Sequence, residues 1–340
     1  MRSLITIAVA TLTVSLPAAG GLTEGPRLAA IYNTIIAARF DDARVQIRDA
    51  CPPAREAACQ TLAGVSLWWQ VLINPESRLL DQPLNDAAAA AIATASAWTR
   101  REPENAEAWF YLAAAYGPLV QWRVLREERI AAAREGKKVK DALERALRLD
   151  PSIDDAYFGI GLYHYYAAVA PAYAKVLRWL MWMPGGDRAG GLREMERARD
   201  RGTILGGEAD YQLHLAYLWY ERQPQRALDL LVALDRRYPT NPLFLQRIAE
   251  VRDTYFHDAS ASASAYRELL ERALAGSVYM PSIAEVRARL GIAHASIALG
   301  YYDVAIDHAR IVIEKNPSAP IGARARAEAL MKSARDRKIF

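Results

Sequence analysis

Residues 154–202 have the sequence DDAYFGIGLYHYYAAVAPAYAKVLRWLMWMPGGDRAGGLREMERARDRG, and this stretch decides the fold. Its first part places Tyr157, Ile160 and His164 at spacings of three and four residues, which form one stripe along an α-helix. The PGGD sequence at 184–187 then breaks the helix, because proline and glycine both disfavour a helix interior. A second helix is predicted after this break, so the stretch encodes two helices joined by a sharp corner.

The rest of the chain also favours helices. Hydrophobic residues make up 52% of the 340 residues, which is enough to bury a core. The alanine-rich run from Asp86 to Ala97 favours helix, and no segment shows the sustained alternation that is typical of a strand. We therefore predict an all-α protein, and its length suits an extended array of helical repeats.

The helical stripe of the opening stretch has a counterpart upstream. The segment PENAEAWFYLAAAYG places Trp109, Leu112, Ala113 and Tyr116 in the same relative positions. This pattern resembles the first helix of a tetratricopeptide repeat, and LGYYDVAIDHARIVIEKNP at 299–317 resembles the second helix. The resemblance implies a tetratricopeptide-like, right-handed solenoid of helical hairpins after residue 20. The clearest repeats are expected at 103–151, 152–203, 206–239 and 286–317, with a C-terminal capping helix at 318–340.

A second resemblance covers residues 157–242 and includes the turn at 184–187. This part is similar to a subset of the same superfamily, the exported bacterial repeat proteins, and distantly to the yeast inclusion-body clearance protein family. The resemblance implies no catalytic residues.

The first 20 residues have the features of a signal peptide. Arg2 supplies a positive charge, an apolar run from Leu4 to Leu16 follows, and Ala18-Ala19-Gly20 offers small residues for cleavage. The apolar run is shorter than the about 20 residues that a transmembrane helix needs. We expect cleavage after Gly20, export, and a location in the periplasm or at the periphery of the outer membrane.

The chain contains two cysteines, Cys51 and Cys59, in the segment CPPAREAAC. In an oxidising compartment so close a pair predicts a disulfide bond. Closing this short loop contributes about 2.5 kcal/mol in the chain-entropy model. A metal site is the less favoured alternative, because no histidine accompanies the pair. Pro52 and Pro53 can end one helix and precede the next, so the bond would hold the corner of a helical hairpin.

Charge and motifs argue against several function classes. The formal net charge of +4 is too small to indicate nucleic-acid binding, for which a clustered basic face is expected. No nucleophile elbow, phosphate loop, dinucleotide fingerprint or metal-binding histidine spacing is present. The glycines of PGGDR at 184–188 could suggest a phosphate loop, but a turn with Asp187 as the helix cap explains them better. We therefore expect no enzyme activity, cofactor or metal.

The strongest functional candidates are side chains on the expected concave face, which the first helix of each repeat lines. Aromatic rings there can hold a peptide through their area and their polar tips. Gln246 and Leu290 fall on this face by their spacing. The predicted partner-binding set comprises Phe158, Leu162, Tyr165, Tyr166, Gln212, Trp219, Tyr220 and His294. The alternative is that the segment from Ala167 to Met183 folds back and covers these rings.

The segment AAVAPAYAKVLRWLMWM at 167–183 is apolar almost all round, with Lys175 and Arg178 as its charges. It could be a core helix, a partner-binding helix or an interfacial membrane helix. Three hypotheses follow. The leading one is an exported scaffold that binds a protein or peptide partner on its concave face, in cell-envelope assembly or secretion. The alternatives are a peripheral envelope protein that contacts a membrane through this segment and, less favoured, an enzyme acting on an envelope polymer.

Overall fold

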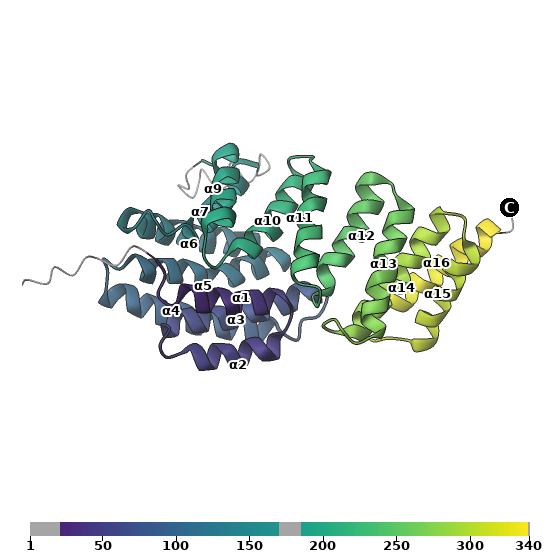
Figure 1. The fold of residues 1–340 in the computed structure, drawn as a ribbon, viewed down its shortest axis with the longest axis horizontal. Helices are drawn as coiled ribbons and strands as arrows, with labels where there is room; N and C mark the ends of the chain where they lie inside the picture. The colour runs from purple at the N-terminus through teal and green to yellow at the C-terminus, as the bar shows by residue number, and fades with distance from the viewer. Residues whose placement is uncertain (1–20, 170–184, 339–340) are drawn as a thin grey trace, which may run out of the picture.

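The computed structural model describes residues 21–169 and 185–338, and the regular structure in these ranges is α-helical throughout. Fifteen helices are described there, and Figure 1 shows them along the chain. Their bounds are α1 Gly25–Ile36, α2 Phe40–Ala50, α3 Glu56–Ile73, α4 Asp81–Arg101, α5 Ala106–Leu125, α6 Arg129–Leu149, α7 Ala156–Val169, α9 Arg188–Arg201, α10 Gly206–Trp219, α11 Pro224–Arg237, α12 Pro242–Phe256, α13 Ala259–Leu274, α14 Pro281–Ala298, α15 Tyr302–Lys315 and α16 Ala323–Lys338.

Helices that are consecutive in the chain pack against one another. The pairs α5 and α6, α7 and α9, α10 and α11, α12 and α13, and α14 and α15 form hairpins, and α16 packs on α14 and α15 at the C-terminal end. The predicted all-α solenoid of helical hairpins is thus confirmed. Within the described ranges, no helix is both long and apolar enough to cross a membrane.

Short polar side chains fix where several helices begin. Asp187 accepts a hydrogen bond from the backbone N–H of Gly190 at 2.9 Å, which confirms its predicted role as the cap of α9. Asn241 accepts one from Leu243 at the start of α12. The connection that leads into α10 is held from a distance, because the Asp155 carboxylate accepts from the N–H groups of residues 203, 204 and 205 at 2.8, 2.9 and 2.8 Å. This contact fixes α10 against the start of α7.

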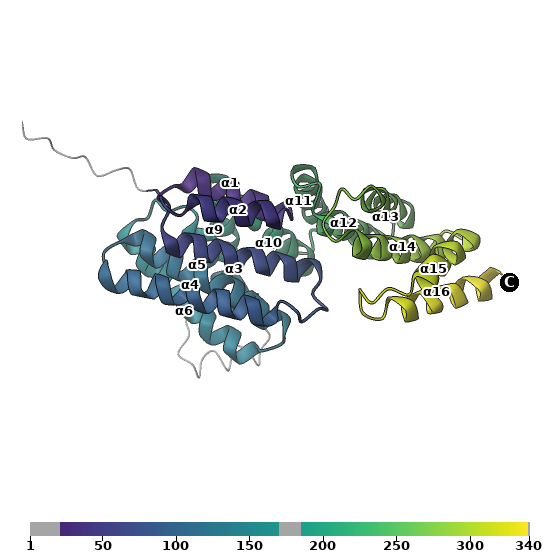
Figure 2. The same ribbon diagram turned by 90° about the horizontal axis from the view of Figure 1, so that it is seen from below.

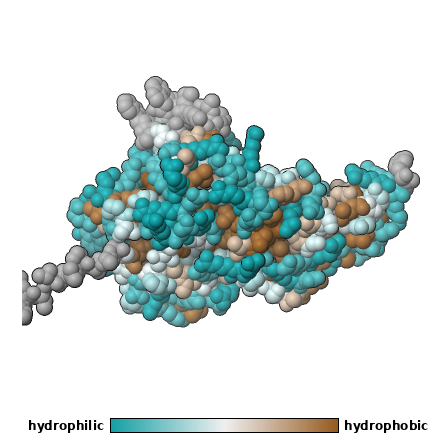
Figure 3. Space-filling view, turned by 45° about the horizontal axis from the view of Figure 1, so that its top comes forward, coloured by the Kyte–Doolittle hydropathy of each residue, from teal (hydrophilic) through white to brown (hydrophobic). Residues whose placement is uncertain are grey.

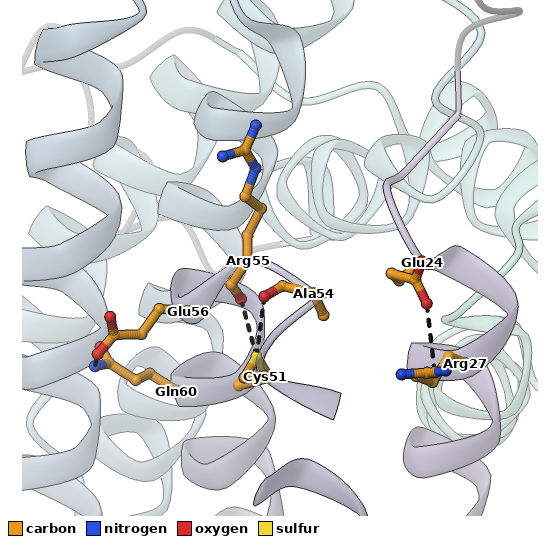
Figure 4. The surroundings of a disulfide bond; sticks show 8 residues. Glu24, Arg27, Cys51, Ala54, Arg55, Glu56 and Gln60 are labelled. Carbon is orange, nitrogen blue, oxygen red and sulfur yellow. Dashed lines mark hydrogen bonds and ion pairs between the residues drawn. A yellow bond between two sulfur atoms is a disulfide. The ribbon is translucent and has the colours of Figure 1, made fainter. Parts of the chain in front are cut away.

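The predicted disulfide between Cys51 and Cys59 is present, with the two Cα atoms 6.5 Å apart. It joins the residue after α2 to the first turn of α3. Cys51 Sγ lies beside the carbonyl oxygens of Ala54 and Arg55, at 3.3 and 3.5 Å (Figure 4). The bond therefore fixes the corner between α2 and α3.

The N-terminal helices pack onto the inner side of the C-terminal repeats. Trp69 of α3 is fully buried, and its ring lies 5.1 Å from that of Tyr211 and 6.0 Å from that of Phe244. The carbonyl of Ile36, at the end of α1, accepts a hydrogen bond from Asn241 at 2.7 Å. Gly207 permits the close approach of α1, since a Cβ there would lie 2.8 Å from Ile36. Helices α1 and α3 therefore cover the inner side of α10 and of the N-terminal part of α12.

A buried carboxylate lies at the centre of this contact. Glu208 of α10 is 2% exposed. It accepts hydrogen bonds from the Tyr32 hydroxyl at 3.1 Å, from Trp69 Nε1 at 3.0 Å and from Gln212 Nε2 at 3.4 Å. Burial raises the pKa of Glu208, and these hydrogen bonds oppose that shift. The network joins α1, α3 and α10 through one side chain.

The raised pKa of Glu208 predicts a pH-dependent effect of Glu208→Gln. The unfolded carboxyl group has an ordinary pKa near 4.3. Above that value the unfolded chain loses the proton more readily than the folded chain, so ionisation reduces the free energy of unfolding as pH rises. The amide cannot ionise, so the free energy of unfolding of Glu208→Gln should rise relative to that of the wild type between pH 4 and pH 7.5. Urea unfolding at both pH values measures this.

Glu314→Gln on the exposed side of α15 is the matched control, and its difference from the wild type should stay constant. The prediction concerns only how the difference in free energy of unfolding between variant and wild type changes with pH. An effect of the amide on hydrogen bonding that is the same at both pH values therefore cancels. A difference for Glu208→Gln that is the same at both pH values would contradict the prediction.

Candidate functional site

A cavity of about 570 Å³ lies between the end of α3 and the inner sides of α12, α14 and α16. We call it the C-terminal groove. The α3–α4 and α15–α16 connections face each other beside it (Figure 2), and Glu76 in the first accepts a hydrogen bond from the N–H of Ile321 in the second at 2.8 Å. The groove is lined by Leu72, Pro75, Glu76, Leu243, Gln246, Arg247, Glu250, Tyr266, Arg287, Leu290, Gly291, His294, Arg326, Ala329 and Leu330.

Helical spacing brings these side chains to one surface. Arg287, Leu290 and His294 lie three and four residues apart on α14, so they share one face of that helix. Leu243, Arg247 and Glu250 do the same on α12. His294, which the sequence predicted on the concave face, is exposed and lies 3.4 Å from Asp253 through Nε2. Gln246 and Leu290, placed on that face by the same reasoning, also line the groove.

The groove combines an apolar floor with three guanidinium groups. Leucines from α3, α12, α14 and α16 and the ring of Tyr266 supply the apolar part. Arg247 donates to Glu250 at 2.6 Å, so this charge is paired. Arg326 lies 3.7 Å from Glu76 and donates to the carbonyl of Ile321 at 2.9 Å. The third guanidinium, that of Arg287, has a different environment.

Arg287 has no ion pair to a carboxylate among the described residues. Its Nη1 donates to the carbonyl of Ile73 at 2.6 Å and to Gln246 Oε1 at 3.4 Å. Burial lowers the pKa of Arg287; the nearby Arg247 and Arg326 also lower it, whereas Glu76 and Glu250 oppose this. The guanidinium is therefore held beside the cavity by neutral oxygen atoms, in surroundings that disfavour its charge.

A smaller hollow of about 140 Å³ lies between α10 and α12, and Arg247 and Glu250 line both it and the groove. Trp219 and Tyr255 stand at its rim, and they are 56% and 39% exposed. His214 forms part of the wall of this hollow. Burial, followed by the charge of Arg247, lowers the pKa of His214 to about 3, so the ring is neutral.

Hydrophobic residues gather in the middle of the molecule, between hydrophilic margins, in Figure 3.

Three residues of the predicted partner-binding set are buried, so they do not form an exposed face. Phe158 packs with Ala198 and Ala209 between α7, α9 and α10. Tyr165 is 0% exposed, and its hydroxyl donates to Glu221 at 2.6 Å. Gln212 is 7% exposed because α1 and α3 cover this part of α10. The expected exposure is absent for different reasons: the N-terminal helices cover Gln212, whereas α9 and α10 cover Phe158 and the end of α10 covers Tyr165.

The other members of the set differ in exposure. Leu162 and Tyr166 are half-buried, and the Tyr166 ring lies 5.8 Å from that of Tyr220. Tyr220 and Trp219 are exposed at the end of α10. Most of the apolar segment predicted at 167–183 lies outside the described residues.

The guanidinium groups of the groove were missed from the sequence. Arg287 lies three residues before Leu290 and seven before His294, so the stripe that indicated those two residues also contained it. Arg326 lies on a helix interpreted as a solvated cap. Spacing could have identified Arg287, but its lack of a carboxylate partner depends on the packing of α3 and α16. In the described ranges, no group of three or more His, Cys, Asp or Glu side chains is arranged to hold a metal ion.

No family model and no curated protein matches the chain. Among solved structures, a monomeric mutant of IFIT1 with Gppp-AAAA resembles it at 11% sequence identity and a TM-score of 0.43, covering 88% of this chain and 67% of that one. The order and packing of the chain's own helices show an all-α solenoid of helical hairpins.

The close contact of Gly291 with the Tyr266 ring predicts that a larger side chain at position 291 destabilises the wall of the groove. A Cβ added at Gly291 would collide with the Tyr266 ring, whereas one added at Gly136 in α6 meets no atom within 4 Å. Gly291→Ala should lower the free energy of unfolding by about 1–3 kcal/mol through overpacking. Gly136→Ala should raise it by roughly 0.5–1 kcal/mol, because alanine loses less backbone entropy in a helix. Urea unfolding of both variants measures this, and equal effects would contradict the account.

Proposed function

We propose that the protein is an exported helical-repeat scaffold that binds an extended segment of a partner protein in the C-terminal groove. The observation that carries the proposal is the difference between two parts of the same inner surface. Over α10 that surface is covered by α1 and α3, whereas beside α12, α14 and α16 a cavity of about 570 Å³ remains.

The size and lining of the groove suit a peptide segment. Pockets for small molecules commonly enclose about 300–1,000 Å³ and combine an apolar lining with a few polar groups, so the groove has room for a few side chains of a peptide. The smaller hollow extends the surface along α12 through Arg247 and Glu250. Trp219 and Tyr255 at its rim are residue types that contribute strongly to protein interfaces. A partner segment lying along α12 would contact both hollows.

Two features of the chain support export. Residues 1–20 have the pattern of a signal peptide. The bond between Cys51 and Cys59 suits an oxidising compartment such as the periplasm. We place the scaffold in the periplasm or at the periphery of the outer membrane, where it would act in envelope assembly or secretion.

Partner capture from the exported fraction of the native host tests this function. Trp219→Ala combined with Tyr255→Ala should remove most of the recovered partner, because both rings lie at the rim of the bound surface. Tyr301→Ala is the matched control, since it removes an equally exposed ring, 58% accessible, that does not line either hollow. Mass spectrometry of the captured material identifies the partner and shows whether the scaffold begins at Gly21.

Equal recovery of partner by the double variant and the control would contradict binding at this surface. An N-terminal peptide that retains residues 1–20 would contradict export by cleavage after Gly20. Circular dichroism confirms that both variants remain helical.

A further inference from the structure

We infer that the C-terminal groove selects a partner segment that presents a carboxylate beside apolar side chains, with the guanidinium of Arg287 as its anchor. This inference rests on the proposed function and specifies the chemistry of the segment that the groove takes.

The hydrogen-bonding capacity of Arg287 is only partly used. Its Nη1 donates to the carbonyl of Ile73 and to Gln246. Its Nε and Nη2 have no partner among the residues that the structure describes. A guanidinium presents its N–H groups in a planar fork that matches the two oxygens of a carboxylate. A half-buried cation is costly without an anion, so an incoming carboxylate would offset this cost as well as form hydrogen bonds.

The surrounding charges also favour an anion. Arg247 and Arg326 line the same cavity. Of the two carboxylates in the lining, Glu250 accepts hydrogen bonds from Arg247 and from Gln246, and Glu76 accepts one from the backbone of Ile321. Both carboxylates are thus engaged by other donors, and the lining as a whole, Arg287 included, holds three guanidinium groups and two carboxylates.

The apolar lining specifies what should accompany the carboxylate. Leu290 follows Arg287 by almost one helical turn, and Leu330 and Tyr266 line the cavity with it. An apolar side chain next to the acidic one would lie against these groups and lose its contact with water. A segment that carries only charges would leave this apolar surface unused.

The occupant has to come from another chain. Residues 1–20 and 170–184 contain no aspartate or glutamate, so neither could supply an acidic side chain. Helix α16 continues for twelve residues from Arg326 to Lys338, about 18 Å at 1.5 Å per residue, and ends far from the α3–α4 connection in Figure 1. Charge complementarity therefore indicates an acidic segment of a separate protein.

Selection from a phage-displayed library of random dodecapeptides tests the inference with the full chain. Peptides selected by the wild type should be enriched in Asp or Glu next to large apolar residues. Arg287→Gln should lose this enrichment, whereas Arg310→Gln should keep it. Arg310 is the matched control because it is an exposed arginine of α15, paired with Asp307 and not part of the groove.

Synthetic copies of the best selected peptide, measured by fluorescence anisotropy, give the size of the effect. Replacing its acidic residues by Asn or Gln should weaken binding to the wild type at least about tenfold, and Arg287→Gln should remove that difference. A copy with an amidated C-terminus shows whether the recognised carboxylate is a side chain or the peptide end. Arg326→Gln, at an exposed position of α16, is the second variant if Arg287→Gln impairs folding. It should also weaken binding of the acidic peptide, by about two- to threefold.

Selected peptides without acidic enrichment, or equal affinity of the wild type for the acidic peptide and its amide copy, would overturn the inference and leave the proposed function standing. Failure of the wild type to select any peptide would count against both. A wild-type preference for acidic peptides that Arg287→Gln leaves intact would remove Arg287 as the anchor.

Discussion

The packing of α1 and α3 onto α10 and α12 determines which part of the inner surface stays open. A solenoid of helical hairpins offers a continuous inner face along its length. In this protein Trp69 packs against the rings of Tyr211 and Phe244, and truncation of so large a buried ring typically costs about 3–5 kcal/mol. The N-terminal helices thereby occupy the first part of that face, where solvent or a partner would otherwise lie. Beyond α3 the face remains hollow.

The buried carboxylate of Glu208 makes this packing specific. Apolar contacts alone would tolerate small shifts of α1 and α3, because burial of area has no preferred direction. Donors from Tyr32, Trp69 and Gln212 reach the carboxylate only when the three helices are in register. A polar network in the interior is costly unless it is fully paired, so misaligned arrangements are disfavoured. The same register places the end of α3 beside α12 and α14, where it forms one wall of the groove.

The sequence predicts what is local and fails where distant segments meet. Helical stripes such as Trp109, Leu112 and Tyr116 follow from residue spacing, and the spacing of the cysteines correctly predicts their disulfide. The contact between Tyr32 and Glu208 joins residues 176 positions apart. It depends on how α1 packs against α10, which the residue spacing within one helix does not specify. The concave face was therefore expected to be open at Gln212, where it is covered. His294 lies in the groove, outside the part of the face that α1 and α3 cover, and is exposed as expected. The role of Arg287 emerges only when its neighbours from α3, α12 and α16 are known.

Position-specific photocrosslinking in the native host tests the central claim most directly, because it reports what occupies the groove. The photoreactive residue p-benzoyl-phenylalanine would replace His294 inside the groove and, in a separate variant, Val304, which is 41% exposed on α15 outside it. The account predicts a crosslink to a discrete partner protein from position 294 and none from position 304. The same products from both positions, or products from 304 alone, would contradict it.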